Sequence, residues 1–124
     1  MSKTVLITGG ASGMGLLCGK CYAKEGANVV LVDRNKEALD ACVKEIAAYP
    51  ANVIGVDIDV RDYKKVCEAR DRAVSAFGSI DILINCAGGA ECRICGVSGE
   101  FFNIPIECYD FSIDVNLKGA LYFD

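Results

Sequence analysis

The sequence predicts an α/β fold: a doubly wound parallel sheet between helices, in three α/β/α layers. Short runs of β-branched and aliphatic residues alternate with helical stretches, a pattern typical of βαβ units. The strand-like runs are apolar throughout, as expected of strands covered by helices on both faces. A glycine-rich turn follows the first run directly. These observations together favour a nucleotide-binding type of sheet.

Eight elements are expected along the chain. The strands are predicted at residues 4–8, 28–32, 52–58 and 80–84. The helices are predicted from the glycine-rich turn to about residue 25, then at 36–48, 62–77 and 105–123. Gly26 and Gly78 provide ends for the first and third helices, Pro50 stops the second, and Pro105 starts the last. Residues 87–102, rich in Gly and Cys, are expected to form a loop.

Right-handed crossovers give these strands the order 3-2-1-4. In such a sheet further strands normally follow on the open side of the fourth strand, and a bare edge there invites aggregation. Residues 1–124 are therefore interpreted as one nucleotide-binding domain that breaks off before a fifth strand, within a longer chain.

Composition narrows the possible functions. The 124 residues suffice for one domain, and 52% hydrophobic with 24% charged residues indicates a packed core. A net charge of −4 with no histidine argues against a nucleic-acid partner. The first apolar run is too short for a signal peptide or a membrane span. We therefore expect a cytoplasmic protein with no membrane partner.

The turn after the first strand reads Thr8-Gly9-Gly10-Ala11-Ser12-Gly13-Met14-Gly15. A glycine-rich strand-to-helix turn lets the backbone approach a phosphate, whose charge the helix N-terminus stabilises. The spacing is G-x-x-x-G-x-G and differs from G-x-G-x-x-G. The alternative is a tight turn that binds no ligand.

Asp33 ends the second strand, eighteen residues after Gly15. A carboxylate at this place accepts hydrogen bonds from an adenosine ribose and repels a 2′-phosphate, which favours NAD over NADP. Arg34 beside it argues the other way, because an arginine can accommodate that phosphate. Alternatively Asp33 caps the second helix, a role for which Asn35 competes.

Four segments in order resemble the short-chain dehydrogenase/reductase family, and they cover the whole chain. Thr8-Gly9 with Gly13 and Gly15 is similar to the family's T-G-x-x-x-G-x-G. Three more matches follow the second strand: Asp59-Val60, Asn85-Cys86-Ala87-Gly88, and Asn116 within Asp114-Val115-Asn116-Leu117. The chain is identified as the N-terminal, nucleotide-binding half of a member of that family, with its Rossmann-like fold.

The resemblance implies a site and a reaction. Asp59 would contact the adenine ring, and Asn116 would be the catalytic asparagine that helps to hold a lysine through a water. The implied reaction is NAD-dependent hydride transfer with a small-molecule alcohol or carbonyl substrate, in a homo-oligomer at full length. The expected cofactor-binding residues are Thr8, Gly9, Ser12, Gly13, Met14, Gly15, Asp33, Arg34, Asp59, Val60, Asn85, Ala87 and Gly88.

Two departures from the family pattern matter. Cys86 replaces the second asparagine of N-N-A-G, which removes an amide from an inter-strand contact. The family's serine and Tyr-x-x-x-Lys pair are also missing. Four tyrosines are followed four residues later by Gly26, Val53, Cys67 and Ile113. Two hypotheses remain: a dehydrogenase whose catalytic half lies outside this sequence, or a non-catalytic, truncated nucleotide-binding module.

Eight cysteines include two C-x-x-C pairs, Cys18 with Cys21 and Cys92 with Cys95. Paired units of this kind can hold zinc or act in redox chemistry. The first pair falls on a helix, where Cys18 should face the sheet and Cys21 a neighbouring face. We expect no metal site and mostly structural, reduced thiols.

The last helix has an apolar face that includes Phe111, Val115 and Tyr122. Core packing is the simpler interpretation of this face. The family resemblance also implies a subunit interface on the same helix.

Overall fold

The computed structural model describes residues 2–90, 95–96 and 99–124. Within them, parallel strands β1 (Thr4–Thr8), β2 (Asn28–Asp33), β3 (Val53–Asp57) and β4 (Ile82–Asn85) form one sheet. The strand order is β3-β2-β1-β4, which confirms the predicted topology. Thr8 pairs with Val32 on one side and with Asn85 on the other, so the carboxyl ends of three strands lie together.

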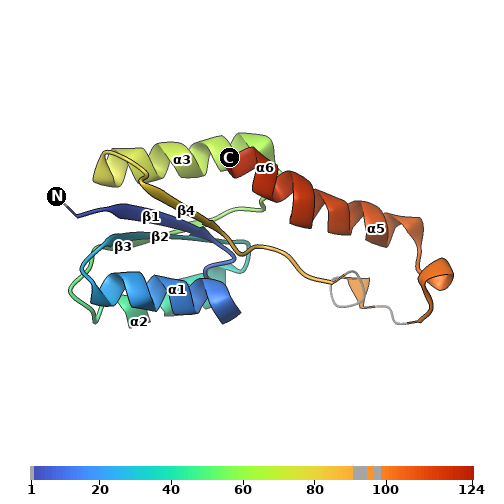
Figure 1. Cartoon of the computed structure of the whole chain (residues 1–124), viewed down its shortest axis with the longest axis horizontal. Helices are drawn as coiled ribbons and strands as arrows, with labels where there is room; N and C mark the ends of the chain where they lie inside the picture. The colour runs from blue at the N-terminus through green and yellow to red at the C-terminus, as the bar shows by residue number, and fades with distance from the viewer. Residues whose placement is uncertain (1, 91–94, 97–98) are drawn as a thin grey trace.

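Helices cover both faces of the sheet and complete the three layers (Figure 1). Helices α1 (Gly13–Lys24) and α2 (Lys36–Ile46) lie on one face. Helix α3 (Tyr63–Phe77) and the C-terminal helix α6 (Gly119–Phe123) lie on the other. The α/β/α class predicted from the apolar runs is therefore confirmed.

Two apolar clusters, one on each face, hold the layers together. Alternate residues of β1 point to opposite faces, because successive side chains in a strand do so. Val5 and Ile7 pack with Leu39 and Ile46 of α2, and all four are almost fully buried. Leu6 packs on the other face in a cluster that includes Val66, Ala69 and Ala73 of α3.

Side-chain caps begin two of the helices. Asn35 Oδ1 accepts a hydrogen bond from the N–H of Ala38 at 3.0 Å and caps α2. Asp62 Oδ1 accepts from the N–H of Lys65 at 3.3 Å and caps α3. Of the two candidates for the α2 cap, Asn35 is the correct one. The alternative role for Asp33 as that cap is wrong.

The predicted element ends differ from the observed ones by one or two residues. Helix α2 ends at Ile46, with Ala47 as its C-cap, and β3 and β4 begin one and two residues later than expected. A short 3₁₀ turn, η1 (Phe101–Asn103), lies at the end of the expected loop. These shifts bring Asn85, expected just after the fourth strand, into β4 as its last residue.

The last helix is not regular as expected. It consists of α5 (Ile106–Ile113), a π-helical stretch η2 (Asp114–Lys118) and α6, which follow each other without a break. Pro105 precedes α5 as its N-cap residue. Within the π stretch, Asn116 Nδ2 donates to the Ser112 carbonyl at 3.0 Å. A side chain that donates to a helix carbonyl competes with the backbone i→i−4 hydrogen bonds, which accounts for the irregularity.

Strand β4 is an edge strand of the described sheet, where it pairs with β1 alone. Helix α6 lies close to its carboxyl end, and Asn85 Nδ2 donates to Asp124 Oδ1 at 3.2 Å. Tyr122 of α6 meets the ring of Tyr63 on α3 edge-on, with 5.3 Å between the ring centroids.

No helix among the described residues is both long and apolar enough to cross a bilayer.

Candidate functional site

A cavity of about 380 Å³ opens at the carboxyl ends of the strands. This is where ligands bind in open α/β sheets, and the volume is in the range of small-molecule sites. The residues around it come from the glycine-rich turn, three strand ends and the last helix. They are Gly9, Ser12, Gly13, Met14, Gly15, Val32, Asp33, Arg34, Ile58, Asp59, Val60, Cys86, Ala87, Gly88, Phe111 and Val115.

Two glycines let the turn pack against the loop that follows β4. Gly9 has a φ of +65°, and a Cβ there would lie 2.7 Å from the backbone N of Ala87. A Cβ on Gly15 would lie 2.8 Å from the carbonyl carbon of Gly9 and 3.3 Å from the Cys86 Cβ. Any side chain at either position would force these segments apart. The glycines therefore shape the floor of the cavity.

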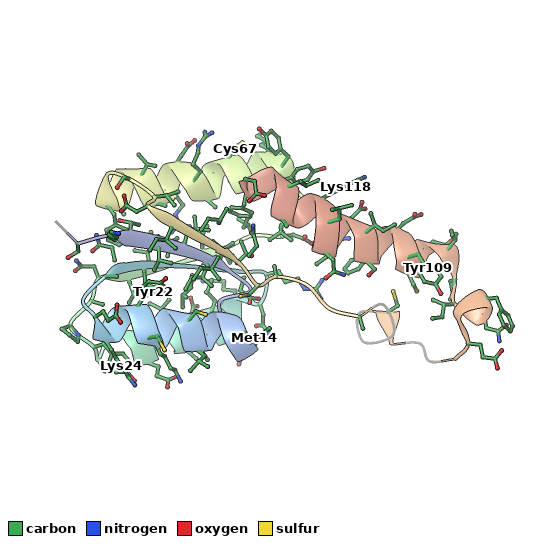
Figure 2. All side chains as sticks on the ribbon, in the orientation of Figure 1. Met14, Tyr22, Lys24, Cys67, Tyr109 and Lys118 are labelled. Carbon is green, nitrogen blue, oxygen red and sulfur yellow. The ribbon has the colours of Figure 1, made fainter. Side chains whose placement is uncertain are left out.

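The N-terminus of α1 faces this cavity. Ser12 is the N-cap residue, has extended backbone angles, and makes no side-chain capping hydrogen bond. The Ser12 side chain thus accepts no hydrogen bond from the N–H groups of the first helical turn. The helix dipole adds a partial positive charge at the same end of the helix. Met14 lies 77% exposed in this first turn, at the end of α1 nearest the strand ends (Figure 2). The arrangement suits an anionic group such as a phosphate.

Asp33 is held at the cavity by two backbone groups. Its Oδ2 accepts a hydrogen bond from the N–H of Ala11 at 3.1 Å, and its Oδ1 accepts from the N–H of Asn35 at 3.0 Å. Each carboxylate oxygen has a second lone pair left for another donor. The side chain is thus a fixed negative acceptor between the glycine-rich turn and β2.

Asp59 lines the cavity just after β3 and forms a close ion pair with Arg61. Arg61 donates to Asp59 through Nε at 3.0 Å and Nη2 at 2.6 Å, and through its backbone N–H at 2.9 Å. These bonds, the side-chain bond foremost, hold the pKa of the Asp59 carboxyl below its ordinary range. The carboxylate therefore stays ionised at neutral pH.

Phe111 on α5 connects two arginines at the rim. The Arg61 guanidinium lies 4.0 Å from its ring centroid, and that of Arg34 lies 5.7 Å away. Both distances are within the range of a cation–π interaction. The ring thereby joins the end of β2, the residues after β3 and α5 around one wall of the cavity.

Thr8 and Asn85, both expected to bind cofactor, do not line the cavity. Thr8 is 1% exposed, and its Oγ1 accepts hydrogen bonds from the N–H groups of Cys86 and Ala87, both at 3.1 Å. Thr8 thus fixes the loop after β4 against β1. Asn85 donates a hydrogen bond to Asp124. Thr8 and Asn85 therefore support the residues that line the cavity and do not line it themselves.

Asn116, expected to be catalytic, also lies outside the cavity lining. Its Oδ1 accepts from the N–H of Gly89 at 2.9 Å, and its Nδ2 donates to the Gly89 carbonyl at 2.8 Å. The same Nδ2 bonds to the carbonyl and hydroxyl of Ser112. In this structure Asn116 positions the start of the loop after β4, and the expected catalytic role stays a prediction.

Five lining residues were not among the expected binders: Val32, Ile58, Cys86, Phe111 and Val115. Val32 directly precedes Asp33, and Ile58 directly precedes Asp59. Adjacency to an expected binding residue is therefore the sequence signal that could have identified them. Phe111 and Val115 were assigned to an apolar helix face, and only the three-dimensional packing brings that face to the cavity. Cys86 contributes its side chain, and burial raises the pKa of its thiol.

The cysteines of the first C-x-x-C pair lie as the helix prediction placed them. Cys18 is half-buried and packs against the apolar cluster on the sheet face that α1 and α2 cover, and Cys21 is exposed. Cys92 of the second pair lies outside the described residues. Across the described ranges, no three His, Cys, Asp or Glu side chains gather in a way that could hold a metal ion.

Residues 3–123 match the family described as short chain dehydrogenase. The chain belongs to that family. Oxidoreductase UcpA of Salmonella typhimurium is 38% identical over 118 residues, which are 95% of this chain and 42% of that protein. The 3-oxoacyl-[acyl-carrier-protein] reductase FabG of Thermotoga maritima is 37% identical over 95% of this chain and 46% of its own. The chain thus spans less than half the length of these relatives.

Solved structures of a dehydrogenase and a reductase superpose closely on this chain. NAD⁺-bound xylitol dehydrogenase gives a TM-score of 0.89 at 27% identity, over 98% of this chain and 45% of its own. L-Sorbose reductase from Gluconobacter frateurii, complexed with NADPH and L-sorbose, gives 0.87 at 28% identity, over 98% and 44%. The two neighbours carry different nicotinamide cofactors, so the fold does not decide between NAD and NADP.

Proposed function

We propose that this chain binds NAD in the cavity at the strand ends and forms the cofactor half of an oxidoreductase. The observation that carries the proposal is the joint placement of two features at one cavity. The uncapped N-terminus of α1 offers N–H donors, and Asp33 offers an oriented carboxylate. As part of the same proposal, residues 1–124 belong to one nucleotide-binding domain whose fifth strand lies outside them.

The residues present fit a dinucleotide. Gly9 and Gly15 carry no Cβ, so the turn can come close to a pyrophosphate. The partial positive charge at the N-terminus of α1 would stabilise the negative charge of that pyrophosphate. The apolar side chains of Ile58, Phe111 and Val115 would hold the adenine ring. Asp59, Val60, Ala87 and Gly88 complete the wall.

Asp33 supports a preference for NAD over NADP. Its carboxylate has free lone pairs for the two ribose hydroxyls, and its charge would repel a 2′-phosphate at the same place. Arg34 follows Asp33 directly in the sequence, and its guanidinium lies 5.7 Å from the centroid of the Phe111 ring. A fixed anion therefore outweighs an exposed arginine at this point of the cavity.

NAD supplies hydride acceptance and donation when bound, and the proposed substrate is a small alcohol or carbonyl compound. Within this chain, Asn116 orders the Gly89 backbone beside the site. The proton-transfer residues of the reaction would come from sequence beyond Asp124. A reading frame that continues into a serine and a Tyr-x-x-x-Lys supports the enzyme, and one that stops favours a non-catalytic binding module.

We also propose a homo-oligomer at full length and a cytoplasmic location. Ile113, Leu117 and Leu121 are each about half exposed along α5, η2 and α6, which supports a contact surface on that helix. Cys42 and Cys108 are buried as small apolar residues, which suits thiols in a reducing compartment.

Calorimetric titration with NAD and with NADP tests the function. We expect one site, with NAD bound at least about 10-fold more tightly than NADP. Equal affinities would contradict the preference for NAD. No heat of binding from either nucleotide at millimolar concentration would contradict the cofactor site itself.

A further inference from the structure

The Asp59 carboxylate lines the nucleotide cavity, yet Arg61 already occupies its acceptor sites. Asp59 Oδ1 accepts from the backbone N–H of Arg61 at 2.9 Å and from Arg61 Nε at 3.0 Å. Asp59 Oδ2 accepts from the same Nε at 3.0 Å and from Nη2 at 2.6 Å. Because a carboxylate oxygen has two lone pairs, these bonds use the acceptor capacity of both oxygens.

A second contact holds the Arg61 side chain in this position. Its guanidinium lies 4.0 Å from the centroid of the Phe111 ring on α5, within the range of a cation–π interaction. The side chains of Arg61 and Asp59 are only 36% and 31% exposed. Arg61 is thus fixed between a carboxylate that follows β3 and an aromatic ring of α5.

We propose that Arg61 is a positioning residue that keeps Asp59 from recognising the base of a bound dinucleotide. The inference rests on the proposed NAD site and concerns which base that site accepts. Ile58, Phe111 and Val115, which are proposed to hold the base, line the same cavity as Asp59. A free carboxylate there would accept a hydrogen bond from the 6-amino group of adenine. With Arg61 in place, the site has little preference between adenine and a purine that lacks this amino group.

A bound adenine would not displace Arg61. To accept from the amino group, Asp59 Oδ2 would have to release the arginine fork. The exchange would replace two N–H donors of a cation by one N–H donor of a neutral amine. Forked arginine–carboxylate pairs gain both energy and geometric specificity from their parallel bonds. The ion pair therefore persists when the base is bound.

The Arg61 side chain can be removed without loss of the Asp59 orientation. In Arg61→Met the backbone N–H of residue 61 can still donate to Asp59 Oδ1. The lone pairs of Oδ2 then become free at the cavity wall. A free anionic acceptor attracts an amino group and repels a carbonyl oxygen in the same place. Loss of the side chain should therefore create a base preference.

Calorimetric titrations with NAD and with nicotinamide hypoxanthine dinucleotide test the proposal. The second nucleotide carries a carbonyl oxygen in place of the 6-amino group of adenine. We expect the wild type to bind both with affinities within about threefold of each other. Arg61→Met should prefer NAD by at least about 10-fold, because a hydrogen bond to a charged group is gained. Arg61→Lys, which keeps the charge without the fork, should show a smaller preference.

Two further variants make the result specific. Addition of Asp59→Leu to Arg61→Met should remove the gained preference, because the acceptor is then absent. Arg70→Met is the matched control, since Arg70 pairs with the neighbouring Asp71 on α3 and does not line the cavity. Its two affinities should equal those of the wild type.

The outcomes separate this inference from the proposed NAD site. A wild-type preference for NAD of about 10-fold or more would overturn the inference and leave the NAD site intact. An Arg61→Met protein that binds NAD with the wild-type ratio of affinities would overturn it as well. Failure of both nucleotides to bind the wild type would contradict the NAD site and this inference together.

Discussion

The Asp33 carboxylate accepts a hydrogen bond from the backbone N–H of Ala11 at 3.1 Å, which joins the end of β2 to the glycine-rich turn. This hydrogen bond fixes the turn relative to β2, and it also fixes the direction of the remaining lone pairs of the Asp33 carboxylate. The same contact links the two features that the proposed NAD site requires. Its removal should therefore affect cofactor choice more than the fold.

Asp33→Asn tests that role. The amide keeps the size of the side chain but loses its charge and one acceptor. Since a hydrogen bond to a charged group contributes about 1.5–3 kcal/mol, NAD should bind about 10- to 100-fold more weakly. NADP should lose less, because the repulsion of its 2′-phosphate disappears. Calorimetry measures both affinities.

Asp40→Asn is the matched control, because Asp40 lies exposed on α2 and pairs with Lys36. It should leave both affinities unchanged. An Asp33→Asn protein with the NAD-to-NADP ratio of the wild type would show that Asp33 does not select the cofactor.

Gly15→Ala tests the close approach at the floor of the cavity. The added Cβ would lie 2.8 Å from the Gly9 carbonyl carbon, so the turn must shift. We expect a loss of about 2 kcal/mol in the free energy of unfolding, typical of overpacking, as well as weaker NAD binding. Urea denaturation gives the first quantity. Gly78→Asn, where a side chain meets open space after α3, should cost less than half as much.

The Asp59–Arg61 pair predicts a pH dependence of stability. Because Arg61 lowers the pKa of Asp59 in the folded state, the unfolded state binds more protons as the pH falls. The pair therefore stabilises the fold above the ordinary carboxyl pKa, and this contribution is lost as the pH falls toward the lowered value. The stability gap between wild type and Asp59→Asn should be constant above about pH 5 and shrink toward pH 3.

Urea midpoints at several pH values measure this gap. Asp71→Asn serves as the control, since Asp71 is an exposed partner of Arg70 on α3. A gap between wild type and Asp59→Asn that does not change between pH 7 and pH 3 would contradict the assigned cause.

Asn116→Ala should release the start of the loop after β4. The Gly89 N–H and carbonyl each lose a partner, so we expect a destabilisation of about 1–2 kcal/mol. Amide hydrogen exchange at Gly89 should become faster, while amides in β1 and β2 keep their order of protection. Unchanged exchange at Gly89 would argue that the backbone there is held by other contacts. Asn52→Ala, which also removes a side-chain hydrogen bond but at an exposed position just before β3, is a suitable control.

Local patterns were sufficient to predict the strands, the topology and the glycine-rich turn. Apolar runs such as Asn28–Asp33 and the glycines around Ser12 are determined by neighbours in sequence. The structure added contacts between distant segments. Phe111 reaches Arg61 across fifty residues, and no periodicity encodes that distance. The π stretch at Asn116 was likewise hidden, because it depends on one side chain that competes for the Ser112 carbonyl.

Thr8 illustrates a different limit of sequence interpretation. A motif position next to a binding turn suggests ligand contact, yet the Thr8 hydroxyl accepts from two backbone N–H groups after β4 and donates to Asn85 Oδ1. Only burial distinguishes a residue that touches a ligand from one that supports the residues that do.

The most direct test of the proposed NAD site is an amide NMR titration of the isotope-labelled protein with NAD. The site predicts saturable shifts at Gly9, Gly13, Gly15, Asp33 and Gly88, with the amides of Ala69 and Ala73 in the middle of α3 unmoved. Shifts confined to other surfaces, or no saturable shift at millimolar NAD, would contradict it.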